Sequence, residues 1–489
     1  MVSFNSIPSN IRTPFTAVEI DNTRASQGPA LLPYRVGIVG QKRSTGTATA
    51  NTWHRVTSAD QVVALAGRGS QLHRMARAYF LNNQSTETWI GVVADDSGGT
   101  AAAGTITVTG PSTAAGTLAL WIAGERVTVA VAAGAAQNTI ASAINTAINA
   151  ATNLPVTSAV STNVVTWTYR HKGTAGNDID VRLNYQDGET TPAGVSLAFA
   201  STVTGATNPT LTDLIAAMGD TWYQVLVHPY TDATSLTAIE TEMSSRFGPM
   251  RMIDGVAITS AAGSVSTLGT LGDSRNSGHS AIVSQAGESP LTPPAEFAAA
   301  VAGVVAFYAP QDPARPLQTL PLVGVLPPAE ADLFTLNERN LLLYDGIGTV
   351  KVAAGGVVQL ERLVTTYQTN AAGSADTSYL DVTTMLTLLY LRYSFRTQIQ
   401  NRYPRHKILD DDTRIGAGQA YITPKLGKAE AVAWFQQMEE LGLVEGLEQF
   451  KRDVVCERNA SDPNRMDWVL PANIANQFIV GAVGIQFRL

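Results

Sequence analysis

The most constraining feature of this sequence is an alternation of apolar strands and amphipathic helices that stops near residue 96 and resumes after residue 205. Residues 35–40 and 89–94 are short apolar runs, and two stretches with helical periodicity, 58–66 and 70–81, lie between them. Strand, helices and strand in this order predict a crossover onto a parallel sheet. A parallel sheet with helices packed on it is therefore the expected centre of the chain.

The same pattern continues beyond the interruption. Strands and helices are predicted at residues 222–228, 236–247, 253–259, 280–284 and 294–306. Because a chain of 489 residues exceeds what one core usually supports, several domains are expected. We assign residues 31–96 plus 206–330 to one α/β core domain.

The interrupting segment, residues 97–205, differs in composition. It begins with a Gly-rich connector and is rich in Ala, Thr, Val and Gly. Alternating strands are expected at 105–109, 117–122, 126–131, 163–169 and 178–184, with one helix at 139–150. Flexible surface loops are where insertions are best tolerated, so this segment is interpreted as a small inserted α+β, β-rich domain.

Residues 331–475 are expected to form a C-terminal α+β domain after a proline-rich crossover at 310–330. Ser378, with Asp381 three residues later, resembles a capping box and predicts a helix that continues to about Asn401. A helix at 428–441 and strands at 450–458 and 467–470 should follow. The predicted fold class is α/β and α+β multidomain, with extended arms at both ends.

The last residues, 476–489, read as a strand carried to the chain end. Its anchoring face is predicted to consist of Ile479, Val483, Ile485 and Phe487. Such a strand must pair with something, because unpaired chain ends fray. Two alternatives follow: the strand closes the sheet of its own domain, or it completes the sheet of a neighbouring subunit.

The N-terminal residues 1–30 are punctuated by proline and show no helical stripe. Phe15 and Val18 alternate with polar residues over a length that suits a short strand, although no hairpin partner lies nearby. An extended arm and a disordered tail are the two interpretations, and the apolar content favours the arm.

Composition excludes several classes of function. The formal net charge of −7 gives no electrostatic footprint for nucleic acid, and no apolar stretch reaches membrane-spanning length. No basic region followed by an apolar run marks a leader peptide. A single cysteine, Cys456, cannot form an intramolecular disulfide and is expected to be a small packed residue.

Catalytic and metal-binding patterns are weak. Ser274 with His279 nearby is similar to the serine block of some lipolytic hydrolases, but no oxyanion-loop glycines accompany it. Residues 410–412 are three aspartates without further ligands at regular spacing, which is typical of a solvated loop. Neither a catalytic site, a metal site nor a cofactor is therefore expected.

One basic cluster stands out around the end of the long C-terminal helix. Cations at a helix C-terminus favour the helix dipole. They could equally face an acidic partner. The cluster consists of Arg392, Arg396, Arg402, Arg405 and Lys407.

Several separate blocks of the C-terminal third, in order, resemble the tail sheath proteins of Mu-like contractile bacteriophages, and Arg275-Asn-Ser resembles a core segment of that family. The blocks are Asn337-Glu-Arg-Asn-Leu-Leu-Leu-Tyr-Asp-Gly, Glu361-Arg-Leu-Val-Thr-Thr-Tyr-Gln, Tyr379-Leu-Asp-Val, Pro404-Arg-His-Lys, Val455-Cys-Glu-Arg-Asn, Asp462-Pro-Asn-Arg and Asn476-Gln-Phe. The match is close over residues 330–489 and loose elsewhere. It says least about the inserted domain.

This resemblance implies a structural protein of the virion rather than an enzyme. Sheath subunits of this family stack as hexameric rings around the tail tube and contract to drive the tube through the host envelope. The resemblance implies that both arms reach into neighbouring subunits, and it suggests that the basic cluster contacts the tube. It also implies baseplate and tail terminator proteins as partners, and assembly in the host cytoplasm. The alternatives are a sheath of a phage-derived injection particle, or a serine esterase with an adhesive inserted domain.

Overall fold

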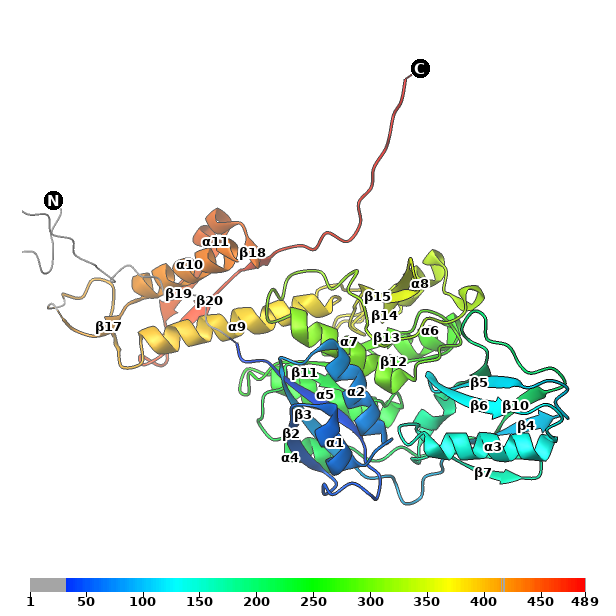
Figure 1. Ribbon diagram of the computed structural model, residues 1–489. Coiled ribbons are helices and arrows are strands. Elements are labelled where there is room, and N and C mark those ends of the chain that lie inside the picture. Colours follow the sequence, from blue (N-terminus) through cyan, green and yellow to red (C-terminus); the bar gives the residue numbers. More distant parts are fainter. Residues whose placement is uncertain (1–31, 415, 417, 489) are drawn as a thin grey trace, which may run out of the picture.

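The computed structural model describes residues 32–414, 416 and 418–488. The chain forms a central α/β body, an inserted domain on one side and a helical C-terminal domain on the other, with a C-terminal tail that leaves the body (Figure 1). The predicted fold class is confirmed.

An eight-stranded sheet in the order β15-β14-β13-β12-β11-β1-β3-β2 organises the body. Pairing is parallel from β3 to β14, and the edge strands β2 and β15 are antiparallel to their neighbours. Strand β1 is continuously apolar and buried from Val36 to Gly40, because helices cover both faces of a parallel sheet. The strands are β1 (Arg35–Gln41), β2 (Thr52–Val56), β3 (Glu87–Val93), β11 (Val225–Val227), β12 (Val256–Ala261), β13 (Ser280–Ser284), β14 (Ile347–Ala353) and β15 (Val357–Arg362).

Helices α2 and α7 pack on each other and on one face of this sheet. Helices α4, α5, α6 and α8 contribute side chains to two other apolar clusters of the body. Helix α7 is apolar around almost its whole circumference and is buried accordingly. Gly303 permits its close approach to α2, because a Cβ there would lie 2.9 Å from the Cβ of Asn82. The helices are α1 (Ala59–Ala66), α2 (Gln71–Asn82), α4 (Thr212–Met218), α5 (Ala233–Phe247), α6 (Val265–Asp273), α7 (Pro294–Tyr308) and α8 (Leu336–Tyr344), with a short 3-10 turn η2 (Glu330–Asp332).

The inserted domain leaves the sheet after β3 and returns before β11, and both of these strands pair with β1. It contains two antiparallel sheets, β10-β4-β8-β7 and β6-β5-β9, and a separate apolar core that includes the buried face of α3. Its elements are β4 (Ala103–Thr109), β5 (Gly116–Ile122), β6 (Glu125–Val131), α3 (Gln137–Ala150), β7 (Val156–Ser161), β8 (Val164–Tyr169), η1 (Thr174–Asp178), β9 (Val181–Leu183) and β10 (Ser196–Val203).

Helix α9 joins the body to the C-terminal domain. Its first half contributes Val382 and Leu386 to the body's core. Further along, Leu391 belongs to the core of the C-terminal domain. In that core the rings of Phe435 and Phe450 stack with their centroids 4.0 Å apart. The C-terminal elements are α9 (Val382–Arg402), β16 (Lys407–Ile408), β17 (Tyr421–Ile422), α10 (Pro424–Glu440), β18 (Val444–Glu445), α11 (Leu447–Asp453), β19 (Val455–Arg458), β20 (Met466–Val469) and β21 (Asn473–Ile474).

Three local predictions are wrong. The predicted capping box of Ser378 and Asp381 does not form: α9 begins only at Val382, and the Ser378 hydroxyl donates to Asp376. Asp381 occupies the N-cap position, but its carboxylate makes no capping hydrogen bond and accepts from Arg362 at 2.9 and 3.0 Å. Residues 331–362 were assigned to the C-terminal domain, but β14 pairs in parallel with β13 and therefore extends the body's sheet. Phe450 was placed in a strand, yet it is the buried residue of α11.

Candidate functional site: surfaces for assembly

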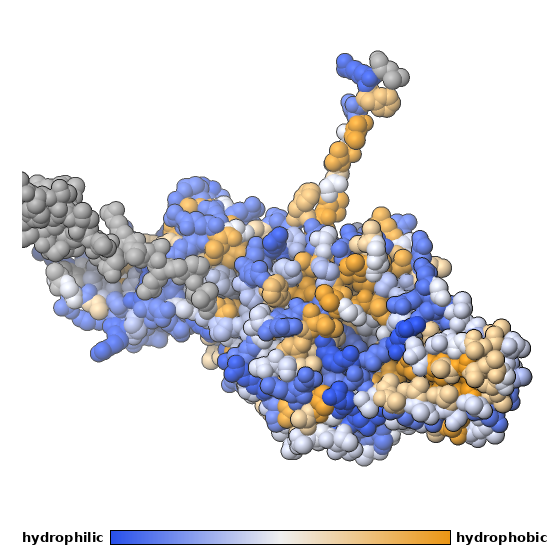
Figure 2. All heavy atoms as spheres, in the orientation of Figure 1, coloured by the Kyte–Doolittle hydropathy of each residue, from blue (hydrophilic) through white to orange (hydrophobic). Residues whose placement is uncertain are grey.

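The C-terminal tail, residues 476–488, forms neither strand nor helix within its own chain. The chain is held up to Ala475, whose amide donates to the Leu443 carbonyl at 3.0 Å beside the β18–β21 pair. Beyond this point it extends away from the body with its apolar side chains in solvent (Figures 1 and 2). Strand pairing predicted for this segment therefore has no partner among the described residues of the same chain.

Within the described part of the chain, the hydrogen bonds between tail and body lie at the root of the tail. The Gln318 side-chain amide donates to the Phe478 carbonyl at 3.3 Å, and Gln477 bonds to the Thr383 hydroxyl. Of the predicted anchoring residues, Ile479 is half-buried near the root, while Val483, Ile485 and Phe487 are 80–88 % exposed. Phe15 and Val18, predicted for the N-terminal arm, lie outside the described residues.

The hairpin β19–β20 offers open sheet edges in the same domain. Each of its strands is paired only with the other among the described residues. One face packs on α10, where the Trp468 indole donates to the Gly427 carbonyl at 3.2 Å. The opposite face carries Val455 and Val469, which are 45 % and 60 % exposed. The hairpin thus combines edges that no other described strand pairs with and an exposed pair of valines beside Glu457 and Asp467, and such open edges allow addition of another strand.

Cys456 lies on the packed face of this hairpin. Burial raises the pKa of its thiol to about 12, and the nearby carboxylates of Asp411 and Glu457 act in the same direction. A thiol with such a pKa is not a nucleophile at neutral pH. The residue is half-buried, and the prediction that it serves packing agrees with this environment.

The basic cluster does not form one surface. The guanidinium of Arg392 turns toward the body, where Nη1 donates to Asp254 at 2.8 Å and to the Phe247 carbonyl at 2.6 Å, with the Phe247 ring 4.4 Å away. Arg396 lies over the Trp222 ring at 5.9 Å. The sequence pattern could not reveal this arrangement, because Asp254 precedes Arg392 by 138 residues.

The remaining members of the cluster lie further along α9 and in the loop that follows. Arg402 pairs with Glu430 of α10 at 2.6 Å and is exposed. Arg405 and Lys407 are exposed beyond the end of the helix. Of the five residues predicted to contact a tube, these three are the ones whose charges face solvent.

Polar contacts attach the inserted domain to the body. Arg74 of α2, only 2 % exposed, pairs with Glu296 of α7 at 2.5 Å and with Glu125 of the inserted domain at 3.0 Å. Its guanidinium also donates to the carbonyls of Ala123 and Asn153. A buried guanidinium with this many acceptors fixes the position of the inserted domain on the body.

The residues considered for catalysis are engaged elsewhere. The Ser274 hydroxyl donates to the Leu271 carbonyl at 2.7 Å, and the His279 ring packs against Phe247 at 4.7 Å. Burial lowers the pKa of His279 to about 4. Asp410 pairs with Arg458 at 3.2 Å. The described part of the chain contains no group of three or more potential metal ligands, and none of its helices is long and apolar enough to cross a membrane.

The domains of this chain match families of known proteins. Three phage tail sheath families match the chain: the beta-sandwich domain over residues 97–196, the central domain over 204–366 and the C-terminal domain over 374–488. The Mu-like prophage FluMu tail sheath protein of Haemophilus influenzae is 39% identical over 488 residues, covering 100% of both chains.

Solved structures share the fold at low sequence identity. The sheath tail protein Lin1278 of Listeria innocua has a TM-score of 0.50 at 12% identity, covering 92% of this chain and 94% of that one. The sheath tail protein of Desulfitobacterium hafniense has a TM-score of 0.48 at 13% identity, covering 94% and 100%. Full-length identity to the prophage protein and the order of the matched domains agree, and the chain belongs to the tail sheath proteins of Mu-like phages.

Proposed function

We propose that this chain is the repeating, non-enzymatic subunit of a contractile sheath, and that residues 476–488 link each subunit to a neighbour. The subunits would stack as hexameric rings around the tail tube, assemble in the host cytoplasm and contract to drive the tube through the host envelope. Baseplate and tail terminator proteins would bind the two ends. The single observation that supports this proposal is an apolar, extended tail whose strand has no pairing partner among the described residues of its own chain.

The energetics of the tail favour an intermolecular partner. Full burial of a Val, Ile or Phe side chain contributes about 1.5–3 kcal/mol, and the tail exposes several such residues. Beyond the root, its backbone donors and acceptors also find no partner among residues 32–414, 416 and 418–488, and a neighbouring strand would satisfy them. Burial and backbone pairing together offset the entropy lost when the tail becomes ordered.

We assign the edges of the β19–β20 hairpin as the acceptor. A donated strand would extend this hairpin at its edge, and apolar side chains of the donor would lie beside the exposed Val455 and Val469. Because donor and acceptor are different surfaces of the same chain, the contact is heterologous and repeats without closing on itself. This is the symmetry that a helical sheath requires.

Contraction imposes a second requirement. Subunit bodies must exchange their contacts while the subunits stay connected, so two classes of interface with different stability are needed. A strand paired through its backbone persists independently of the contacts between bodies. The exposed residues Arg402, Arg405 and Lys407 are proposed to contact an acidic surface of the tube.

The test compares the full chain with a chain that ends at Ala475, using negative-stain microscopy of the purified proteins. The full chain is expected to form tubes, and the truncated chain to remain folded and monomeric. Ile485→Asp should prevent polymerisation because the side chain belongs to the predicted anchoring face. Gln486→Asp is the matched control, because Gln486 is next to Ile485 in the chain and its side chain is predicted to lie on the opposite face of the strand. Normal tubes from the truncated chain would refute strand donation.

A further inference from the structure

The inserted domain reaches into the place where open α/β sheets usually bind their ligands. Strand β1 lies between β3 and β11, and the order of the strands along the sheet reverses at this point. In such sheets the crevice outside the carboxyl ends of the strands is the usual ligand site. The segment that follows β8 lies in this crevice, because the side-chain amide of Gln41, the last residue of β1, donates to the Lys172 carbonyl at 2.8 Å.

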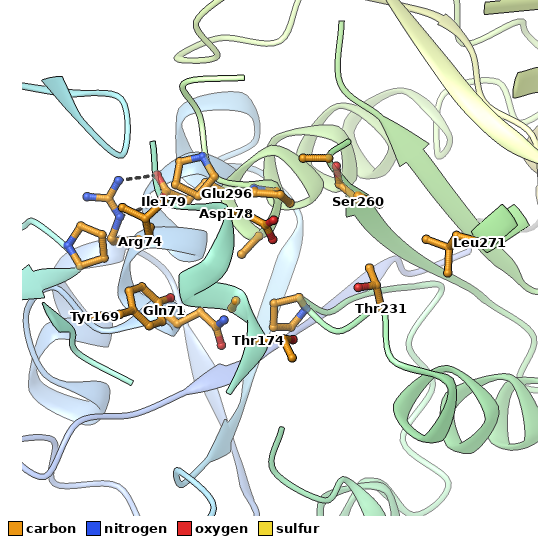
Figure 3. Close-up of a pocket in the computed structure, with 18 of the residues that line it drawn as sticks. Gln71, Arg74, Tyr169, Thr174, Asp178, Ile179, Thr231, Ser260, Leu271 and Glu296 are labelled. Atoms are coloured by element: carbon orange, nitrogen blue, oxygen red, sulfur yellow. Dashed lines mark hydrogen bonds and ion pairs between the residues drawn. The ribbon is translucent and has the colours of Figure 1, made fainter. Parts of the chain in front are cut away.

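Polar contacts determine how the two domains are joined. Among the described residues, the apolar core of the inserted domain is separate from the apolar clusters of the body. Figure 3 shows the boundary at a cavity of about 260 Å³ that both domains line, with Tyr169 of the inserted domain and Gln71 and Glu296 of the body at its wall. The position of the inserted domain therefore depends on where its hydrogen-bonding groups find partners.

His171 is a buried side chain of the inserted domain that bonds to the body in this crevice. It is 1 % exposed, and its Nε2 accepts from the backbone amide of Gln71 at 3.0 Å. Because Gln71 is the first residue of α2, its amide has no acceptor within the helix. His171 thus supplies the acceptor that the start of α2 requires.

The second ring nitrogen of His171 is held by Asp95, which follows β3. Nδ1 lies 2.8 Å from a carboxylate oxygen of Asp95. A backbone amide can only donate, so Nε2 is the unprotonated nitrogen, and Nδ1 carries the proton of the neutral ring. The ring therefore accepts from the helix and donates to the carboxylate.

Asp95 is itself fixed by both domains. The same oxygen accepts from the Gln41 side-chain amide at 3.0 Å, and the other oxygen accepts from the Lys172 backbone amide at 3.2 Å. Gln41 is fully buried, and its backbone amide donates to the Gln71 side chain at 3.1 Å. The ends of β1 and β3 and the start of α2 thus converge on residues 171 and 172 of the inserted domain.

We propose that His171 is the positioning residue that docks the inserted domain in the ligand crevice of the body, so that the two domains move as one unit. One side chain joins the inserted domain to two elements of the body. Because buried donors and acceptors cost free energy when they lose their partners, replacing the ring should open the crevice. Arg74 donates to other residues of the inserted domain, so the rest of the attachment should persist.

The test measures hydrogen exchange of the purified full chain, resolved to single amides by electron-transfer fragmentation. His171→Phe removes both ring contacts, and the Gln71 amide should exchange at least tenfold faster than in the native chain. His171→Gln keeps an acceptor near the position of Nε2 and should retain most of the protection. His171→Asn keeps only a donor near the position of Nδ1 and should lose it. His54→Phe, on the edge strand β2, is the matched control and should leave the Gln71 amide unchanged.

Trypsin provides an independent readout at the docked segment itself. Arg170 and Lys172 flank His171, and trypsin cleaves after both residue types. The Lys172 carbonyl accepts from Gln41, so cleavage there should be slow in the native chain. Mass spectrometry should show cleavage after Lys172 rising at least tenfold in His171→Phe and by less in His171→Gln.

Two results would overturn the proposal. One is unchanged exchange of the Gln71 amide and unchanged cleavage after Lys172 in the folded His171→Phe and His171→Asn proteins. The other is an equal acceleration of exchange throughout the inserted domain in all three His171 variants, because it would show that the residue stabilises that domain without positioning it on the body.

Discussion

Substituting Arg392 by methionine should weaken the attachment of α9 to the body. Methionine keeps much of the apolar stem of arginine, but it removes the ion pair with Asp254, the hydrogen bond to the Phe247 carbonyl and the cation–π contact with the Phe247 ring. Asp254 is 4 % exposed, and its second carboxylate oxygen has no partner among the described residues. The substitution therefore leaves a buried carboxylate without a counter-ion.

The expected magnitude follows from the burial of the pair. Removing one partner of a buried ion pair costs about 3–5 kcal/mol. The side chain of Arg392 is 30% exposed, which places this pair at the lower end, about 3 kcal/mol at pH 8. The cation–π contact accounts for about 0.5–1 kcal/mol of this loss.

The loss should depend on pH in a definite direction. Burial raises the pKa of Asp254 from 3.8 to about 6, and the charge of Arg392 opposes that rise. Because the folded chain holds this proton more tightly than the unfolded chain, the contribution of Asp254 to stability is complete below pH 3.8 and is lost as the pH rises through about 6. Without Arg392 the pKa rises further and the loss extends to higher pH. The substitution should therefore cost about 1 kcal/mol at pH 5, where Asp254 is already mostly protonated, and about 3 kcal/mol at pH 8.

Hydrogen exchange of the α9 amides, corrected for intrinsic rates and followed by mass spectrometry, measures this loss locally. At pH 8 the amides around Arg392 should exchange about two orders of magnitude faster in Arg392→Met than in the native chain. Arg396→Met is the matched control, because Arg396 lies over the Trp222 ring at 5.9 Å and its charge lowers the pKa of Asp254 less than that of Arg392 does, so it should change exchange by less than about fivefold. Equal losses at pH 5 and pH 8, or unchanged exchange at pH 8, would refute the role of the Asp254 carboxylate.

Three further predictions concern separate parts of the chain. Excising residues 97–205 should leave a folded body that still polymerises, measured by circular dichroism and sedimentation; loss of fold would show that the body depends on the insertion. Gly272→Ala would place a methyl group against the Asp345 carbonyl oxygen and should cost about 1–3 kcal/mol in urea denaturation, whereas Gly484→Ala, with no neighbour within 4 Å, should cost nothing. The Cys456 thiol, whose pKa burial raises to about 12, should resist iodoacetamide at pH 8 until urea unfolds the chain; rapid labelling in the native state would contradict this burial.

Long, strongly periodic elements of the body could be predicted from the sequence. Helix α2 begins where expected, because the Ser70 side chain accepts from the His73 amide, and its helical periodicity corresponds to a buried face that includes Leu72 and Met75. Strands with little apolar patterning were missed: β7 is largely exposed and β10 is exposed along nearly its whole length. Helix α8 was not predicted either, because it buries only Leu342 and shows no apolar stripe.

The functional surfaces could be predicted only where the signal lies in neighbouring residues of the sequence. The apolar alternation of the tail is a local property and could be read from residues 476–488, but its partner is not encoded nearby. The role of Arg392 depends on residues more than a hundred positions away in the chain. The run of basic residues along the helix therefore indicated a charged face, but Arg392, the first of them, pairs with Asp254 of the same chain.

The arrangement of α9 restricts where a contracting sheath could deform. Its first half belongs to the body's core through Val382 and Leu386, and from Leu391 onward it belongs to the C-terminal core. One helix shared by two cores, and tied to the body by Arg392, cannot act as a swivel without breaking buried contacts. Beyond their root, residues 476–488 have no such contacts with the rest of the described chain. If subunits rotate during contraction, the tail and its root must therefore absorb the movement, while the body and the C-terminal domain turn together.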